Sequence, residues 1–62
     1  MQAIRVLVAE PFSDDRANVA AMFRATGRSI LTEVSDGPSA LRVLQQEPFD
    51  LVLISGSLPR FD

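Results

Sequence analysis

The sequence contains no cysteine and no histidine. Without these residues the chain cannot form a disulfide framework or a Cys/His zinc site. The same absences remove the Ser-His-Asp and Cys-His catalytic arrangements and any phosphohistidine carrier role. They leave the redox compartment undetermined. Several common classes of enzyme and metal site are therefore excluded before any motif is considered.

Lysine is also missing, and the chain has no block of positive charge. The formal net charge is −2, and the positive residues are scattered arginines: Arg5, Arg16, Arg24, Arg28, Arg42 and Arg60. This pattern argues against nucleic-acid binding. The apolar runs are far shorter than a membrane span, and no signal-peptide pattern follows the first residues. We therefore expect a cytoplasmic protein with no membrane partner.

The chain has 62 residues, of which 47% are hydrophobic. That fraction is typical of a globular protein, and the length allows one small domain over residues 1–62. A domain this short buries only roughly 60% of its unfolded surface and is marginally stable by itself. Oligomerisation is a common remedy in proteins of this size.

The first part of the chain predicts a strand followed by a helix. Ile4–Ala9 is a short apolar run rich in β-branched residues. Ser13 is expected to cap a helix, and Asp14 and Asp15 suit the positive N-terminal end of its dipole. Gly27 is well placed to end this helix. The residues at helical spacing are Val19, Met22, Phe23 and Thr26, with Met22 and Phe23 expected in the core.

The second part predicts strand, helix and strand. Residues 30–34 include a threonine and a glutamate, which indicates a partly solvated edge strand. A turn around Pro38 begins the next helix, and Glu47 with Pro48 ends it. Residues 51–54 are continuously apolar, so we expect a strand covered on both faces. The helix between these strands has an apolar face made of Ala40, Leu41, Val43 and Leu44.

Strands alternating with helices imply parallel β-α-β units with right-handed crossovers. Ligand chemistry in such α/β sheets lies at the carboxyl ends of the strands. In this chain those ends carry Glu10-Pro11 and Ser55-Gly56-Ser57.

Three stretches, in their order and spacing, resemble one bacterial signalling family. They are Arg5-Val6-Leu7-Val8-Ala9, then Ser35-Asp36-Gly37 with Ala40-Leu41, then Phe49-Asp50-Leu51-Val52-Leu53 followed by Leu58-Pro59 and Asp62. Together they resemble the N-terminal half of a response-regulator receiver domain. The resemblance implies half of a flavodoxin-like fold, with a three-stranded parallel sheet of order 2-1-3 and helices on both faces.

The resemblance also implies where a phosphorylation pocket would lie. Its acidic pair falls on Glu10 and Pro11, its phosphoacceptor on Ser55, and its metal-binding backbone carbonyl on Ser57. Only Glu10 keeps a carboxylate. Acyl-phosphate formation needs a carboxylate nucleophile and a metal ion. We therefore expect a degenerate phosphorylation pocket with no catalytic residue, no metal and no cofactor.

The resemblance covers about half of the family's domain, and the strands that carry its Thr/Ser and Lys partners do not follow. The third strand would then be a sheet edge with unpaired backbone groups, which favours association. We expect a homodimer in which these edges form one continuous six-stranded sheet. The interface residues would be Leu51, Val52, Leu53 and Ile54, and Phe61 would be exposed or packed on a partner.

The sequence therefore predicts a non-phosphorylatable receiver-like module that acts by protein–protein contact in bacterial signal transduction. A histidine kinase or an output domain is another partner that the resemblance implies. Two alternatives remain open. One is a fragment of a working two-component receiver that is phosphorylated in an unusual way. The other is a purely structural N-terminal oligomerisation domain of a longer output protein.

Overall fold

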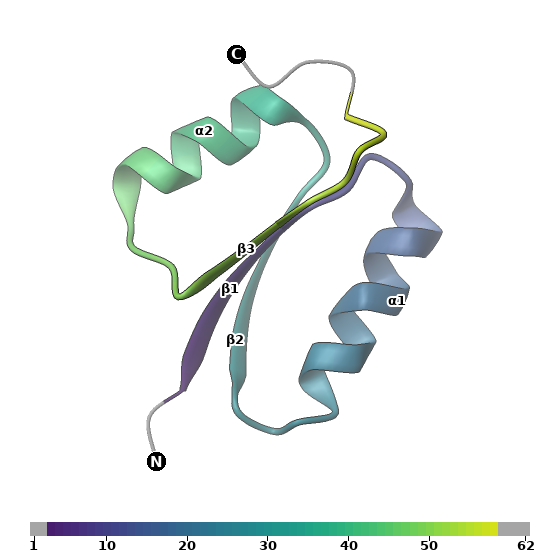
Figure 1. Cartoon of the computed structure of the whole chain (residues 1–62), viewed down its shortest axis with the longest axis vertical. Helices are drawn as coiled ribbons and strands as arrows, with labels where there is room; N and C mark the ends of the chain where they lie inside the picture. The colour runs from purple at the N-terminus through teal and green to yellow at the C-terminus, as the bar shows by residue number, and fades with distance from the viewer. Residues whose placement is uncertain (1–2, 59–62) are drawn as a thin grey trace.

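The computed structural model describes residues 3–58. The elements are β1 (Ile4–Ala9), α1 (Ser13–Arg24), β2 (Ser29–Val34), α2 (Gly37–Gln46) and β3 (Leu51–Ile54). The strands form one parallel sheet of order β2-β1-β3. The two helices lie on opposite faces of this sheet (Figure 1). The predicted α/β architecture, its strand order and its covering by helices on both faces are confirmed.

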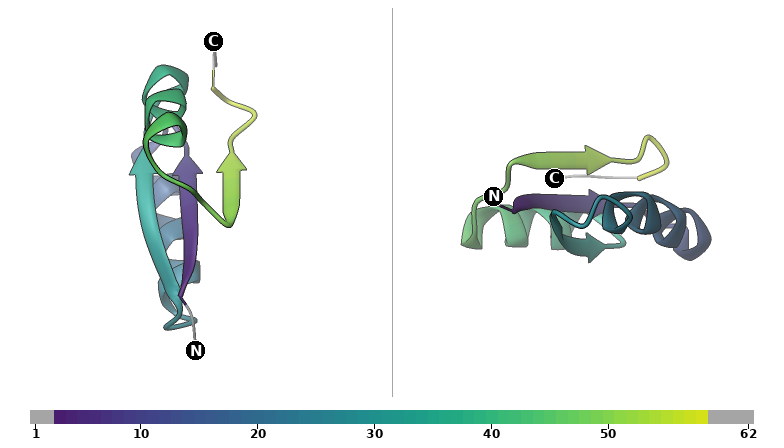
Figure 2. Two further views of the ribbon diagram at one scale, coloured as in Figure 1. Left: turned by 90° about the vertical axis from the view of Figure 1, so that its left-hand side faces the viewer. Right: turned by 90° about the horizontal axis from the view of Figure 1, so that it is seen from below.

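The core is built on the central strand β1, which lies between β2 and β3 (Figure 2). Its residues Val6, Leu7, Val8 and Ala9 are at most 2% exposed. Side chains alternate along a strand, so Leu7 and Ala9 share one face and pack with Ala40 of α2. Val6 and Val8 face the opposite side, which α1 covers. A single strand therefore supplies most of the buried apolar volume.

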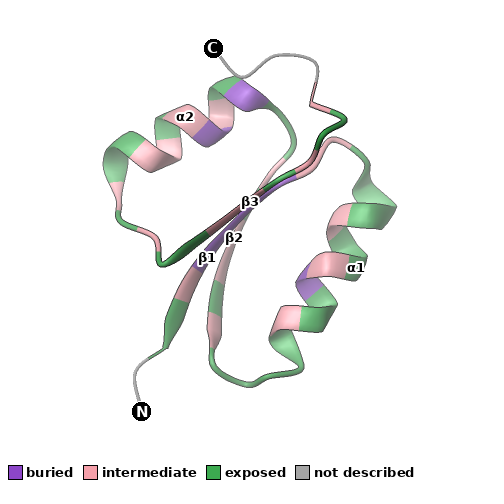
Figure 3. Cartoon of the chain, viewed as in Figure 1, coloured by how far each residue is buried: buried purple, intermediate pink, exposed green. Residues whose placement is uncertain are grey.

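The prediction that residues 51–54 are covered on both faces is wrong for this structure. Leu51 is 40% exposed and Ile54 is 51% exposed. β3 lies at an edge of the sheet, whereas the helices pack mainly near β1 and β2. Figure 3 shows this contrast between buried β1 and partly exposed β3. The apolar run of β3 therefore presents surface that the other residues of the described range 3–58 leave exposed.

A reciprocal contact before β3 holds that strand beside β1. The backbone N–H of Arg5 donates to Oδ2 of Asp50 at 2.8 Å. The N–H of Asp50 donates to the carbonyl of Arg5 at 2.8 Å. The Arg5 guanidinium also pairs with Glu47 and lies over the ring of Phe49, 5.7 Å from its centroid. These contacts fix the register of β3 against β1.

β2 forms the other edge of the sheet, as its polar residues predicted. A charged side chain on this strand disfavours its pairing with another strand. Ile30 is 53% exposed on this strand. Glu33 accepts from Nη2 of Arg24 at 2.8 Å, and its other oxygen lies 4.0 Å from Nε of Arg16. Charged side chains on an edge strand discourage pairing with another chain. The β2 edge therefore carries a charged side chain, whereas the β3 strand is entirely apolar.

The start of α1 differs from the prediction at one residue. Phe12, not Ser13, is the N-cap, and it makes no side-chain capping bond. Its N–H donates to Oε2 of Glu10 at 2.9 Å in the turn that precedes the helix. Asp14 and Asp15 lie in the first turn as expected. The predicted serine cap is therefore wrong, and the predicted acidic first turn is confirmed.

The end of α1 agrees with the expected role of glycine, but its apolar face is narrower than expected. Gly27 has a φ of 72°, a left-handed conformation that favours glycine, in the turn after the C-cap Ala25. Ala20 is the buried residue of the helix. Met22 is 72% exposed, so its predicted place in the core is wrong, while Phe23 is half-buried.

α2 begins and ends where the sequence predicted. Asp36 is its N-cap, and the carboxylate accepts from the N–H of Ser39 at 2.7 Å. This backbone hydrogen bond lowers the pKa of Asp36 below its ordinary value. Pro38 occupies the first turn and Glu47 is the C-cap. Of the other sequence expectations, those on Pro59, Phe61 and Asp62 lie outside the described residues.

Candidate functional site

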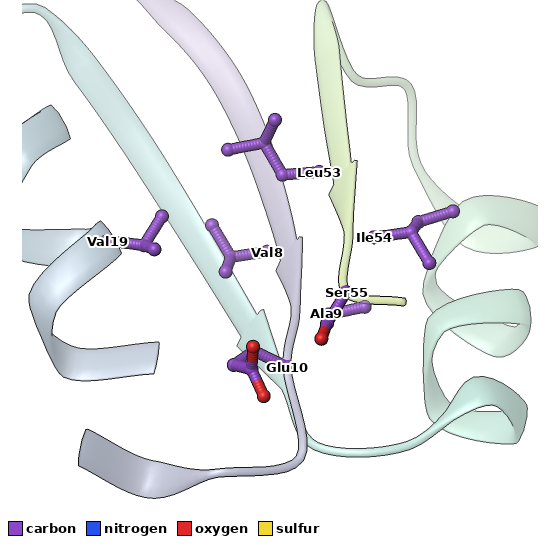
Figure 4. Close-up of a pocket in the computed structure, with 7 residues that line it drawn as sticks. All are labelled: Val8, Ala9, Glu10, Val19, Leu53, Ile54 and Ser55. Carbon is purple, nitrogen blue, oxygen red and sulfur yellow. The ribbon is translucent and has the colours of Figure 1, made fainter. Parts of the chain in front are cut away.

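The carboxyl ends of β1 and β3 lie side by side, as the predicted topology requires. Ala9 and Ile54 are partners in the register. The N–H of Ser55 donates to the carbonyl of Ala9 at 2.9 Å. Glu10 and Ser55 consequently line one hollow of about 160 Å³ (Figure 4). The structure brings these two predicted site residues together, whereas Pro11 and Ser57 do not line the hollow.

Glu10 is engaged in the turn from β1 to α1. Its Oε2 accepts from the N–H of Phe12 at 2.9 Å. Its backbone carbonyl accepts from Nη1 of Arg16 at 2.8 Å, and its N–H donates to the carbonyl of Val34 at 3.0 Å. Pro11 fixes the backbone between these contacts and supplies no polar side chain. The one carboxylate of the predicted pocket therefore organises its own loop.

Ser55 makes the local hydrogen bonds expected of a serine at the end of a strand. Its Oγ accepts from the N–H of Ser57 at 3.0 Å. Its carbonyl accepts from the N–H of Leu58 at 3.2 Å. Serine hydroxyls close turns in this way. Ser57 contributes its backbone N–H to this turn, and its side chain is exposed.

The walls of the hollow are mainly apolar. They combine Glu10 and Ser55 with residues of β1, α1 and β3: Val8, Ala9, Val19, Leu53 and Ile54. In Figure 4, Leu53 lies on the same side of the sheet as Val8 and Val19, while Ile54 points to the other side. Sequence reasoning named Leu53 for its strand. Val8 joins the site through its register with Leu53, and Val19 joins it through the packing of α1 against the sheet.

A divalent cation such as Mg²⁺ prefers several oxygen ligands, usually including clustered carboxylates. Within residues 3–58 no three histidine, cysteine or acidic side chains are grouped so that they could hold a metal ion. Of the residues that the structure describes, Glu10 is the one acidic residue that lines the hollow. The geometry therefore suits apolar contact better than charge-dependent chemistry.

A second hollow of about 250 Å³ lies at the carboxyl end of β2 and is polar. Its lining includes Arg16, Glu33, Ser35 and Ser39. Glu33 partly compensates the charge of Arg16, since their side-chain atoms lie 4.0 Å apart. This region joins α1 to β2 and to the start of α2.

The four residues predicted for an interface lie along the β3 edge, with different surroundings. Val52 packs against the core cluster that contains Leu7 and Ala40. Leu53 lines the first hollow. Leu51 and Ile54 are exposed. This edge therefore presents apolar groups on both faces of the sheet.

No protein-family model, curated protein or solved structure matches this chain. The resemblance to a receiver domain thus stays a prediction from the sequence motifs. Among residues 3–58 no helix is long and apolar enough to cross a membrane.

Proposed function

We propose that this chain is a receiver-like module of bacterial signal transduction, working in the cytoplasm. It acts by protein–protein contact and not by phosphotransfer. Its strand order and the meeting of Glu10 with Ser55 are compatible with the geometry that the receiver resemblance implies. The functional contact lies on β3, and its simplest form is a homodimer with a continuous six-stranded sheet.

The hydrogen bonding at the strand ends supports a role without phosphotransfer. An acyl phosphate requires a carboxylate, and the phosphoacceptor position holds Ser55, whose Oγ accepts from a backbone N–H. Glu10 is bound to the backbone of its own loop. Within the described range, neither residue is grouped with further carboxylates that would bind Mg²⁺ and neutralise a phosphoryl group.

The observation that carries the contact function is the exposed apolar edge of β3. Leu51 and Ile54 are 40% and 51% exposed, although the strand consists entirely of leucine, valine and isoleucine. An apolar edge strand with unpaired backbone groups is an association site. A second strand placed against this edge would remove apolar surface from water. It would also supply hydrogen bonds to the backbone groups of the edge strand.

Incubation with acetyl phosphate and Mg²⁺ is expected to leave the mass of the intact chain unchanged. The reason is the absence of a carboxylate at Ser55 and at Pro11. Mass spectrometry measures the result directly. A mass increase of one phosphate on the native chain would contradict the proposal and favour a working receiver.

The matched control combines Pro11→Asp with Ser55→Asp and thereby restores the two missing carboxylates. Crowding of like charges is expected to destabilise this metal-free variant by roughly 1–3 kcal/mol, and Mg²⁺ should raise its melting temperature. The native chain should show no such rise. Equal melting of the variant with and without Mg²⁺ would show that the hollow lacks receiver-like geometry.

A further inference from the structure

Asp36 is followed directly by Gly37, and this is the one Asp-Gly step in the sequence. Such a step is chemically labile in a flexible chain, because the backbone nitrogen after the aspartate can attack the side-chain carboxyl carbon. Glycine has no side chain to hinder that approach, and its backbone rotates freely. In this structure the step lies between β2 and α2, where Asp36 is the N-cap and Gly37 is the first helical residue.

The reaction open to this step is an isomerisation through a five-membered succinimide ring. The Gly37 nitrogen bonds to Cγ of Asp36, and the OH of the protonated carboxyl group leaves as water with the amide proton of Gly37. Water then opens the ring at either of its two carbonyl carbons. Opening at Cγ restores aspartate, whereas opening at the α-carbonyl carbon leaves the chain running through Cγ, which is isoaspartate. No oxidant, reductant or second substrate takes part.

Two hydrogen bonds hold Asp36 in a conformation that resists ring closure. Its Oδ1 accepts from the N–H of Ser39 at 2.7 Å. Its backbone carbonyl accepts from the N–H of Ala40 at 3.2 Å. Both donors belong to the start of α2, so the side chain and the carbonyl of Asp36 are tied to the same helix. Closing the ring requires rotation of these groups and would break the bonds.

The backbone angle and the charge of Asp36 also oppose the reaction. Its ψ is 165°, an extended value. A five-membered ring needs the Gly37 nitrogen close to one plane with Cα, Cβ and Cγ of Asp36, and this ψ holds the nitrogen out of that plane. Gly37 is buried, so rotating it would disturb the packing of the helix start. The Ser39 N–H also lowers the pKa of Asp36, which disfavours the protonated carboxyl group that loses water.

We infer that the Asp36–Gly37 step is a site of isoaspartate formation, suppressed by the folded first turn of α2 and released when this turn opens. Local opening at the end of an element costs less free energy than unfolding of the core. Opening frees the side chain and the carbonyl of Asp36 together, since both are held by the same turn. The product lengthens the main chain by one carbon atom and loses the carboxylate arrangement that caps α2. The site therefore converts a transient opening into a lasting covalent change.

Incubation of the full chain in neutral buffer, with and without denaturing guanidinium chloride, tests the suppression. A protein carboxyl methyltransferase, which methylates isoaspartate from S-adenosylmethionine, measures the product after dilution, and peptide mass spectrometry locates it. Formation at Asp36 should be at least about tenfold faster in the denatured chain than in the folded one. Gly37→Ala should slow it in the denatured chain, because the added methyl group hinders the attacking nitrogen. Equal rates in the folded and denatured chains would overturn the inference.

Two matched proline substitutions separate opening of this turn from unfolding of the whole chain. Pro38 lies in the first turn of α2, where its ring restricts the backbone, whereas Pro48 follows the C-cap Glu47 at the other end. Pro38→Ala should raise the rate in the folded chain about two- to fivefold, because the open turn gains conformations. Pro48→Ala should leave that rate unchanged. Equal rates in the two variants would overturn release by local opening, and circular dichroism checks that both are folded.

Discussion

Ile54→Lys is expected to raise the dissociation constant of the proposed homodimer at least about a hundredfold, or about 3 kcal/mol. Ile54 is 51% exposed and is one of the β3 residues of the proposed contact. A lysine there would place an unpaired charge between two apolar surfaces. Because association stabilises a small folded chain, the variant should also melt at a lower temperature. Sedimentation velocity and thermal circular dichroism measure the two effects.

The matched control is Ile30→Lys on the opposite edge of the sheet. Ile30 is 53% exposed and belongs to β2, so it resembles Ile54 in residue type, exposure and edge position. It lies outside the proposed contact, and its replacement should change stability by no more than about 0.5 kcal/mol and leave association intact. Equal weakening by both substitutions would contradict a contact specific to β3.

Leu7→Ala is expected to cost about 2–5 kcal/mol and to remove the cooperative thermal transition of the chain. Leu7 is 0% exposed and is the largest fully buried side chain among the described residues. Domains are stable by only about 0.05–0.15 kcal/mol per residue, so a chain of this length has little reserve. Circular dichroism during heating measures the loss.

Met22→Ala provides the comparison for this core substitution. Met22 is also a large apolar residue, but it is 72% exposed on α1. Its truncation should change stability by no more than about 0.5 kcal/mol. A Leu7→Ala variant that melts like the Met22→Ala variant would show that β1 does not supply the core.

The element pattern could be predicted because local chemistry and tertiary structure agree over most of this chain. Pro38 lies in the first turn of α2, as the sequence predicted, and the structure adds Asp36 as its N-cap. The strands follow the short apolar runs, and their order follows the one that the resemblance implied. Burial was less predictable. Both β1 and β3 are rich in apolar residues, but among the strands of residues 3–58 only β1 has a strand on each side.

The candidate site was predictable in position but not in its contacts. The rule that parallel strand ends meet at one edge correctly brings Glu10 to Ser55. The bond from the Phe12 N–H to Glu10 depends on the backbone path through Pro11, which sequence spacing does not specify. The apolar wall from Val19 depends on how α1 packs against the sheet.

Sedimentation equilibrium of the native chain over a wide concentration range tests the contact function most directly. The exposed apolar edge of β3 predicts a reversible approach to twice the mass of one chain as the concentration rises. Thermal stability should rise over the same range, because folding and association are coupled. A single species with the mass of one chain, folded and equally stable at every concentration, would contradict self-association through β3.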